Sequence, residues 1–529
     1  MQIRTPDYVA ILLENGSETY PFSSSVKSND ISVDISLVDE LLHIDLTADR
    51  TPVKYVKLRW NFSDAEKRNE SVKVYGDVWE RGYGDLEWRG IVPDRMMPWV
   101  CAVSNGSDQN RDYNGRYTEC FGVKTGPNAM CMWQYDPAGL TLWLDVRCGG
   151  AGVILQNRTL AVCDVLFGSY RDVSAFDALK AYYKTLCDDP LTVDHKVYGT
   201  NNWYYAYGET SHQEILTDTE LLMDACGELQ NRPYIVLDDG WQKNPCDGPW
   251  DVLREGKFFD MKALANEMCE MGARPGIWIR LLSDQRFEVT DQCSEMRSRC
   301  NDFSLDASHP DTLKYVADLI TMICDWGYTL IKHDFSTYDM VGVWGGERSG
   351  ELAKDGWSFY NRNKTTAEIM LDFYRVIYNT SKGRAIVLGC NVIGHLAAGL
   401  VHLNRTGDDT SGRDWARVRK YGVNALAFRM LHHEAFFLAD ADCIGIMGEI
   451  DWNMNREWMT AVAYSGTPMF VSPKPGVMSE AERQELKEAY RVNSIQTDTL
   501  VPLDWMENVI PEKWLLNGKE THFNWYEKI

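Results

Sequence analysis

Residues 1–190 are dominated by short runs in which hydrophobic and polar residues alternate. Residues 31–37 and 55–62 are examples, and Asn, Asp, Gly and Ser separate one run from the next. Alternation with a period of two buries one face of a strand and exposes the other, which is typical of antiparallel sheets. We therefore expect an N-terminal antiparallel β-sandwich domain over residues 1–190, closed by a helix at 175–185.

The pattern changes after Val197. Hydrophobic runs of strand length now alternate with amphipathic stretches that are long enough for helices. The expected strands are residues 197–204, 234–238, 274–279, 329–334, 385–391, 403–407, 436–443 and 467–472. The expected helices are residues 213–229, 261–271, 312–326, 365–378, 413–432 and 453–464. Eight strands with interleaved helices predict an α/β fold, a catalytic (β/α)8 TIM barrel over residues 191–478.

An open, doubly wound sheet is the alternative arrangement for such a chain. It is disfavoured because no Gly-x-Gly-x-x-Gly turn or Gly-Lys-Ser/Thr loop follows any expected strand. Residues 479–529 begin with a charged helical stretch and end in short strand-like pieces. This pattern predicts a small C-terminal helix/β unit.

Length and composition are those of a globular protein with more than one core. The chain has 529 residues, of which 44% are hydrophobic. No apolar run approaches the roughly 20 residues of a membrane span. The first residues lack the basic, apolar and small-residue segments of a signal peptide. We expect a cytoplasmic protein, or a secreted or periplasmic one if a signal peptide has been removed.

The cysteines and the net charge indicate which cofactors and partners to expect. The 14 cysteines are scattered through apolar stretches and are expected to be free, buried thiols. Neither a Cys-x-x-Cys pair nor a His-x-x-x-His pair backed by Glu occurs, so we expect no metal; no other cofactor is expected. The net charge of −23 would repel nucleic acids and anionic membranes, so neither is an expected partner. The sequence leaves open whether the protein forms a homo-oligomer.

Acidic residues stand where three of the expected barrel strands stop. They are Asp238 and Asp239, Asp334, and Asp408 and Asp409. The carboxyl ends of barrel strands meet at one mouth, so these side chains should converge. Glycoside hydrolysis needs two carboxylates, one at the anomeric carbon and one that protonates the leaving oxygen. Any one of these aspartates taken alone could equally cap the following helix, but three sets at one mouth favour catalysis.

The neighbours of two of these aspartates suggest their roles. Lys332 lies two residues before Asp334, and strand alternation places both side chains on the inner face, where a cation would keep Asp334 ionised as a nucleophile. His333 between them should point outward. Arg405 lies four residues before Asp409. An ion pair there would make Asp409 too acidic for a proton donor unless burial raises its pKa, and the sequence leaves this conflict open.

These segments resemble the clan D glycoside hydrolases, specifically the family 36 α-galactosidases, with family 27 as the nearest relative outside that family. The resemblance covers residues 201–443. The matching motifs, each at an expected strand, are Trp203-Tyr204, Leu237-Asp238-Asp239-Gly240-Trp241, Pro275-Gly276-Ile277-Trp278, Lys332-His333-Asp334, Gly389-Cys390, and Arg405-Thr406-Gly407-Asp408-Asp409-Thr410. Each motif is weak alone, and their order and spacing give the resemblance its specificity.

The resemblance implies a retaining, exo-acting α-galactosidase that removes terminal α-galactosyl residues from an oligosaccharide or glycoconjugate. It implies that Asp334 is the nucleophile and Asp409 the general acid/base, with Asp408 as the rival for the second role. The pair Asp238 and Asp239 would hold the O4 and O6 hydroxyls of galactose.

The remaining substrate-binding residues also follow from the resemblance. Lys332 would contact a ring hydroxyl, Trp278 would stack on the sugar, and Cys390 would lie near O2. Arg405 and Trp203 complete the expected set.

Three further positions are expected near the site. A substrate-binding arginine should precede the fourth strand, where Arg297 and Arg299 are equally placed. Trp88 of the N-terminal region could close the pocket, with a surface or core position as the favoured alternative.

Other functions fit the same barrel. An α-N-acetylgalactosaminidase or a β-L-arabinopyranosidase shares the ring orientation and the retaining mechanism. A transglycosylase uses the same carboxylates with a different acceptor. A non-catalytic carbohydrate-binding protein is disfavoured because both Asp334 and Asp409 are present.

Overall fold

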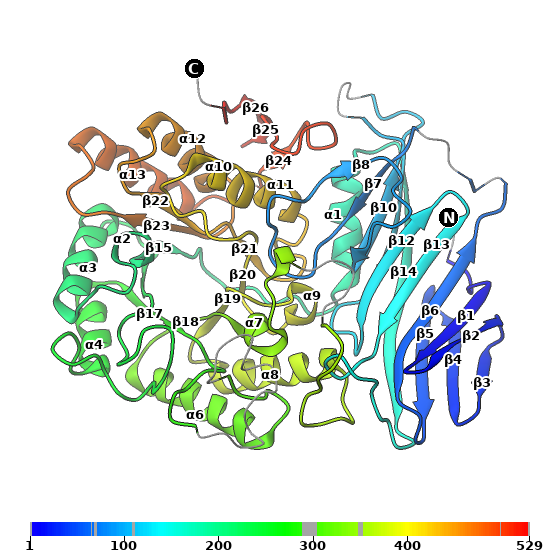
Figure 1. Ribbon diagram of the computed structural model, residues 1–529. Coiled ribbons are helices and arrows are strands. Elements are labelled where there is room, and N and C mark those ends of the chain that lie inside the picture. The colour runs from blue at the N-terminus through cyan, green and yellow to red at the C-terminus, as the bar shows by residue number, and fades with distance from the viewer. Residues whose placement is uncertain are drawn as a thin grey trace.

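The computed structural model describes residues 3–64, 66–67, 71–107, 112–287, 304–347, 353–497 and 499–526. A strand-rich N-terminal part lies beside a larger part in which strands and helices alternate (Figure 1). No helix among these residues has the length and apolar character needed to cross a membrane.

Two antiparallel sheets form the N-terminal part. The six-stranded sheet has the order β2-β1-β6-β13-β12-β9, with β1 (Tyr8–Leu13), β2 (Gly16–Pro21), β6 (Val53–Asn61), β9 (Met97–Pro98), β12 (Met130–Asp136) and β13 (Gly139–Asp145). The eight-stranded sheet has the order β3-β4-β5-β14-β11-β10-β7-β8, with β3 (Ser25–Ser28), β4 (Ile31–Val38), β5 (Leu41–Ala48), β7 (Lys73–Gly76), β8 (Trp88–Arg89), β10 (Val100–Ser104), β11 (Tyr117–Val123) and β14 (Thr159–Arg171). Along β5 more and less buried residues alternate, as the sequence pattern predicts.

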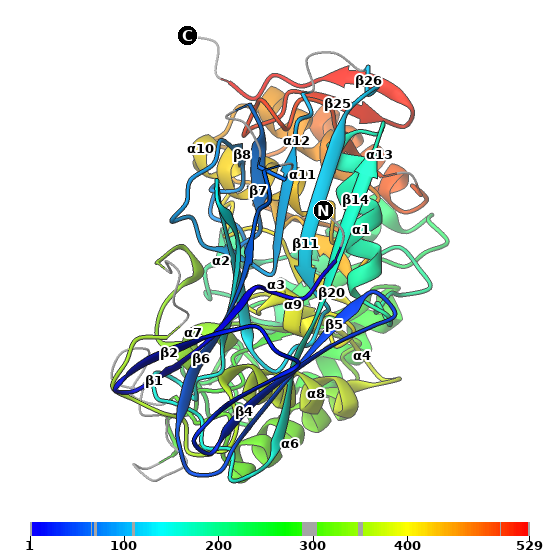
Figure 2. The same ribbon diagram turned by 90° about the vertical axis from the view of Figure 1, so that its right-hand side faces the viewer.

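Aromatic side chains fill the space between the two sheets. Trp60 of the first sheet lies 5.7 Å from Phe167 of the second, measured between ring centroids. Helix α1 (Ala175–Leu186) covers the outer face of the second sheet, beside β11 and β14 (Figure 2). The hydroxyl of Tyr182 on α1 donates to the carbonyl of Leu166 at 2.6 Å. The predicted helix at 175–185 is confirmed.

The second part is built on one curled sheet of parallel strands. Its order is β21-β20-β19-β18-β17-β16-β15-β23-β22. The strands are β15 (Tyr198–Asn201), β16 (Tyr234–Leu237), β17 (Arg274–Ile279), β18 (Leu330–His333), β19 (Ile386–Gly389), β20 (Leu403–Arg405), β21 (Leu438–Asp440), β22 (Cys443–Ile446) and β23 (Met469–Pro473). The α/β class and the parallel sheet that the sequence predicts are therefore present.

The helices between the strands also match most of the prediction. They are α3 (His212–Cys226), α4 (Met261–Met271), α6 (Pro310–Trp326), α8 (Thr366–Ser381) and α12 (Trp452–Ala463). Each begins at a side-chain cap; at α8, for example, Thr365 and Glu368 form a reciprocal capping box. Helices α3, α4, α8 and α12 pack against β16, β17, β19 and β22 respectively, and α6 packs against α4 and α8.

Two predicted elements differ in the structure. The helix expected at 413–432 consists of α10 (Trp415–Arg417), a π-helical segment (Val418–Asn424) and α11 (Ala425–Arg429). The π segment ends at buried Asn424, whose side-chain amide donates to the carbonyls of Leu86 (2.8 Å) and Val509 (2.7 Å) and so joins three regions of the chain. The strand expected at 436–443 is split into β21 and β22 at Asp442, which has a left-handed φ of 71°.

The C-terminal residues form α13 (Glu480–Asn493) and a three-stranded antiparallel sheet of β24 (Val501–Pro502), β25 (Lys513–Leu516) and β26 (Lys519–His522). A charged helix followed by short strands is what the sequence predicts for this region.

A buried ion network joins the N-terminal sheets to the α/β part. The carboxylate of Asp77 lies 3.1 Å from the guanidinium of Arg429 and 3.1 Å from the imidazole of His432. Burial raises the pKa of Asp77, but Arg429 and His432 outweigh burial and hold that pKa below its ordinary value. Removing Arg429 would leave the buried Asp77 carboxylate without its charged partner, so this network fixes how the two parts dock.

Candidate active site

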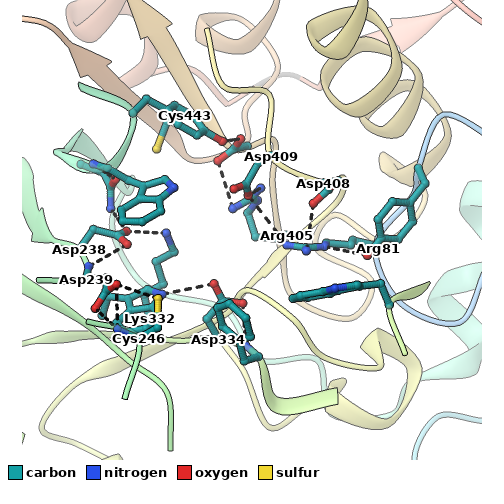
Figure 3. Close-up of a pocket in the computed structure, with 18 of the residues that line it drawn as sticks. Arg81, Asp238, Asp239, Cys246, Lys332, Asp334, Arg405, Asp408, Asp409 and Cys443 are labelled. Carbon is teal, nitrogen blue, oxygen red and sulfur yellow. Dashed lines mark hydrogen bonds and ion pairs between the residues drawn. The ribbon is translucent and has the colours of Figure 1, made fainter. Parts of the chain in front are cut away.

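A cavity of about 420 Å³ opens at the carboxyl ends of the parallel strands, where α/β sheets of this kind place their functional groups (Figure 3). Charged and aromatic side chains line it. They are Arg81, Tyr83, Asn201, Trp203, Tyr204, Asp238, Asp239, Cys246, Trp278, Lys332, Asp334, Phe335, Trp344, Arg405, Asp408, Asp409, Asp442 and Cys443.

Asp238 follows β16 and accepts two hydrogen bonds on one oxygen. The donors are the ammonium of Lys332 at 2.7 Å and the side-chain amide of Asn201 at 2.7 Å. Burial lowers the pKa of Lys332, but the charge of Asp238 overrides burial and raises that pKa well above its ordinary value. The pair is therefore ionic, and Lys332 on β18 binds the aspartate that follows β16, two strands away in the sheet.

Asp239 accepts hydrogen bonds from the loop that follows β16. Gln242 Nε2 lies 2.5 Å away, the Cys246 amide 3.0 Å, and the Cys246 thiol 3.0 Å. Burial raises the pKa of Asp239, while these donors act in the opposite direction. The loop thus holds the Asp239 carboxylate beside that of Asp238.

Asp334 follows β18 and faces the cavity. The indole N–H of Trp278 donates to Oδ2 at 3.3 Å, and the amide of Phe335 donates to Oδ1 at 2.7 Å. Phe335 has a left-handed φ of 60°, which turns the chain at this point. Trp278 therefore orients Asp334 in addition to lining the cavity.

The loop after β20, residues 406–411, is called the acid loop below. Within it, Asp409 lies 3.1 Å from Arg405 Nη2, and Arg405 Nη1 lies 3.1 Å from Asp442. Burial raises the pKa of Asp409, but Arg405 and then Arg81 bring that pKa below its ordinary value. The ion pair that the sequence leaves open is formed, so Asp409 is a carboxylate at neutral pH in the unliganded protein.

Asp408, the adjacent acid, has a different partner. Its carboxylate lies 3.0 Å from Arg81 Nη2 and 3.6 Å from Arg417 Nη2. Arg81 comes from the N-terminal part, so residues that are distant in sequence meet at this wall of the cavity (Figure 3).

No protein-family model matches this chain. Solved structures do resemble it. TtGalA, an α-galactosidase from Thermus thermophilus in complex with p-nitrophenyl α-D-galactopyranoside, has a TM-score of 0.58 at 15% identity over 94% of this chain and 99% of that one. The family 36 α-galactosidase AgaA from Geobacillus stearothermophilus has a TM-score of 0.61 at 13% identity over 97% of this chain and 79% of that one. Variants of AgaA are seen with raffinose and with stachyose. The chain has the family 36 α-galactosidase fold.

On the family 36 fold, most of the residues that the sequence singles out line one cavity: Trp203, Asp238, Asp239, Trp278, Lys332, Asp334, Arg405, Asp408 and Asp409. Cys390 lies behind this surface, 2% exposed, with Arg405 Nη1 at 3.4 Å from its Sγ. His333 points away from the cavity toward Phe373, and burial lowers its pKa to about 4.

Other expected positions lie elsewhere on the family 36 fold. Trp88 is buried, packs 5.6 Å from Trp505 between ring centroids, and does not line the cavity, so of the two alternatives it is the core tryptophan. Arg297 and Arg299 lie outside the described residues. Among those residues, no group of three or more His, Cys, Asp or Glu side chains could hold a metal ion.

Several residues that line the cavity are not predicted from the sequence. Arg81 and Tyr83 come from a loop of the N-terminal part, and Trp344 and Cys246 come from loops after parallel strands. The one local signal was the dense run Trp-Glu-Arg-Gly-Tyr-Gly at residues 79–84, which interrupts the alternating pattern.

Proposed function

We propose that the protein is a retaining, exo-acting α-galactosidase with Asp334 as nucleophile and Asp409 as general acid/base. The observation that carries the proposal is the cavity itself, in which both carboxylates sit beside the Asp238–Lys332 ion pair. Glycosidases of this class need one carboxylate that attacks the anomeric carbon and another that handles the proton of the leaving group.

In the first step an oxygen of Asp334 bonds to the anomeric carbon while the bond to the leaving oxygen breaks. Asp409 gives its proton to that oxygen. In the second step Asp409 removes a proton from water, and the hydroxide oxygen displaces Asp334 to release galactose with its original configuration.

The ionised state of Asp409 in the free protein fits such a cycle. While Asp334 is a carboxylate, its charge favours a proton on Asp409, particularly when bound sugar excludes water from the cavity. Once Asp334 is esterified, that charge is gone, and the pair with Arg405 favours the ionised base. The same residue can then serve in both steps.

Asp238 and Asp239 support the choice of galactose. Charged acceptors that are fixed by Lys332, Asn201 and the Cys246 loop are suited to bind two hydroxyls at once, as O4 and O6 of galactose would require. Sugars that lack either hydroxyl would leave a buried carboxylate without its partner, which penalises them.

The proposal includes the finer architecture. β21 pairs with β20 while β22 pairs with β23, and only Ala441 and Asp442 separate β21 from β22. One interrupted strand thus joins both edges of the sheet, which supports a closed (β/α)8 barrel. The aromatic contacts between the two N-terminal sheets support a β-sandwich.

The structural relatives support an oligosaccharide substrate with a terminal α-galactosyl group, since variants of AgaA bind raffinose and stachyose. A panel of nitrophenyl α-galactoside, α-N-acetylgalactosaminide and β-L-arabinopyranoside tests the assignment. We expect the α-galactoside to be cleaved with the highest kcat/KM and NMR to detect α-galactose as the first product. A β-product, or preference for another sugar, would overturn it.

A further inference from the structure

Residues 80–83, called the N-terminal loop below, reach from the first part of the chain onto three loops of the barrel mouth. One oxygen of Glu80 accepts a hydrogen bond from the amide of Gly345, after β18, at 3.0 Å. Its other oxygen accepts from the side-chain amide of Asn391, after β19, at 2.9 Å. Gly82 forms a parallel β-bridge with Gly407, after β20.

The bridge ties the N-terminal loop to the backbone of the acid loop. The amide of Gly82 donates to the carbonyl of Thr406 at 2.8 Å, and the amide of Asp408 donates to the carbonyl of Gly82 at 3.1 Å. The approach is close on the other side as well, because a Cβ added to Gly407 would lie 1.9 Å from the carbonyl oxygen of Tyr421. The acid loop therefore has little freedom to shift while the N-terminal loop is docked.

Arg81, at the centre of the N-terminal loop, is only 7% exposed and lines the cavity. Its Nη2 lies 3.0 Å from the carboxylate of Asp408, and its Nη1 lies 4.0 Å from that of Asp409. Nε donates to the hydroxyl of Tyr83 at 3.2 Å, and the guanidinium lies 5.5 Å from the centre of the Trp344 ring. The side chain is thus fixed on several sides.

The two adjacent carboxylates of the acid loop have different nearest guanidinium groups. Asp408 pairs with Arg81 from the N-terminal part, and Asp409 pairs with Arg405 from β20. Like charges on neighbouring residues repel each other, and a rotation of the loop would exchange the carboxylate that faces the cavity. Because Arg81 and Arg405 lie on different elements, their pairs with Asp408 and Asp409 favour one orientation of the acid loop.

We propose that Arg81 is the positioning residue of the acid loop: by holding Asp408 it fixes Asp409 toward the cavity, so that the N-terminal part of the chain completes the active site. This inference rests on the proposed function. It assigns to Arg81 an effect that passes through Asp408 to the step in which the leaving oxygen receives a proton.

The test compares Arg81→Met and Arg81→Lys on raffinose and on nitrophenyl α-galactoside. A nitrophenolate leaves without a proton, whereas a sugar alkoxide needs one. We expect Arg81→Met to lower kcat for raffinose by about 10²-fold and that for the aryl substrate by less than about fivefold, with KM little changed for either. Arg81→Lys, which keeps the charge, should restore part of the loss.

Two further readouts separate positioning from a merely structural role. Loss of the cation beside Asp409 should raise the pKa of that group, so the alkaline limb of kcat/KM for raffinose should move to higher pH in Arg81→Met. Azide should not restore activity to Arg81→Met, because the acid/base carboxylate is still present. Rescue by azide, or an unchanged pH profile, would overturn the proposal.

A double-mutant cycle with Asp408→Asn tests whether the effect of Arg81 on activity passes through Asp408. If Arg81 acts through Asp408, the double variant should lose no more activity than Arg81→Met alone. Losses that multiply, or an equal loss on both substrates, would overturn the proposal. Where Arg81→Met does not fold, Arg81→Lys and Asp408→Asn carry the same comparison.

Arg89→Met is the control. Arg89 is an exposed residue of the same part of the chain and forms a surface ion pair with Glu87 at 3.1 Å. Its replacement should leave the activity on both substrates unchanged. Failure of the proposed function is a separate outcome, since then the unaltered protein would cleave neither substrate.

Discussion

The ammonium group of Lys332 on β18 lies 2.7 Å from the carboxylate of Asp238, which follows β16, two strands away in the sheet. The sequence places Lys332 and Asp334 on one face and expects the cation to serve Asp334. The structure gives the cation to Asp238, and Trp278 and Phe335 donate to Asp334. The register of the sheet, which aligns β18 with β17 and β17 with β16, determines which carboxylate the ammonium group of Lys332 reaches. This register is not encoded in any local sequence pattern.

Because Asp238 forms this ion pair, we expect it to contribute to both the activity and the stability of the protein. Asp238→Ala should lower the free energy of unfolding by about 3–5 kcal/mol, because it leaves the buried ammonium of Lys332 without its partner. Chemical denaturation measures this. Adding Lys332→Met should recover much of the stability but none of the activity on nitrophenyl α-galactoside.

The matched control is Asp260→Asn at the N-cap of α4, since asparagine also caps helices. A stable, active Asp238→Ala variant would contradict the role of the pair.

Replacement of the nucleophile has a stereochemical signature. Asp334→Ala should abolish turnover, and added azide should enter from the face that the carboxylate occupied. The product from an α-galactoside is then β-galactosyl azide, identified by NMR. Recovery of activity without azide, or an azide of α-configuration, would mean that another residue attacks the anomeric carbon.

The acid/base assignment is tested by the leaving group. Asp409→Ala should lower kcat/KM for raffinose by about 10²–10⁴-fold and affect the nitrophenyl substrate far less, with slow release of the glycosyl-enzyme limiting the latter. Azide should rescue this variant and give α-galactosyl azide. Asp408→Ala should show no rescue; if it alone is rescued, the roles of Asp408 and Asp409 are exchanged.

A buried histidine predicts a pH-dependent contribution to stability. Burial lowers the pKa of His395 to about 4. Between its unfolded pKa of about 6.5 and this value, the unfolded chain binds a proton that the folded chain does not, so His395 costs stability as the pH falls. Relative to the protein with His395→Gln, the unaltered protein should lose up to about 3 kcal/mol between pH 7 and pH 4.

The comparison with a variant is necessary because other groups oppose this trend. Burial raises the pKa of Asp218 and of Asp440 to about 6, and both stabilise the folded protein as the pH falls. Glutamine can still donate to the carbonyl of Val123, which His395 Nε2 contacts at 2.7 Å. His522→Gln, at an exposed histidine, is the control; a pH-independent difference for His395→Gln would refute the prediction.

Sequence periodicity was sufficient for the regular elements. Strand β17 and helix α4 lie at the predicted residues, because their hydrophobic faces and their caps are local properties. The break at Asp442 was not predictable in this way. Its carboxylate binds Arg405 at 3.1 Å and the amide of Thr410 at 2.8 Å, both distant in sequence, and the strand bends to make these contacts.

The same distinction holds for the site. The carboxylates are predictable because a parallel sheet brings the carboxyl ends of its strands to one edge wherever they occur in the chain. Arg81 was not found, since alternation in the N-terminal part reveals its strands but not the surface on which its loops dock. Trp88 shows the same limit, because a tryptophan in a charged run can be a core residue or a sugar-binding residue, and only its neighbours in the fold decide between the two.

The bridge between Gly82 and Gly407 also limits how this protein can diversify. Barrels and sandwiches are often treated as modules that recombination can exchange between relatives. Here a grafted N-terminal part would have to bring a loop of the same length, with glycine and arginine at the matching positions, to keep its contacts with the acid loop. If Arg81 positions the acid loop as proposed, the two parts must change together, and a substitution in the N-terminal loop can alter the leaving-group preference.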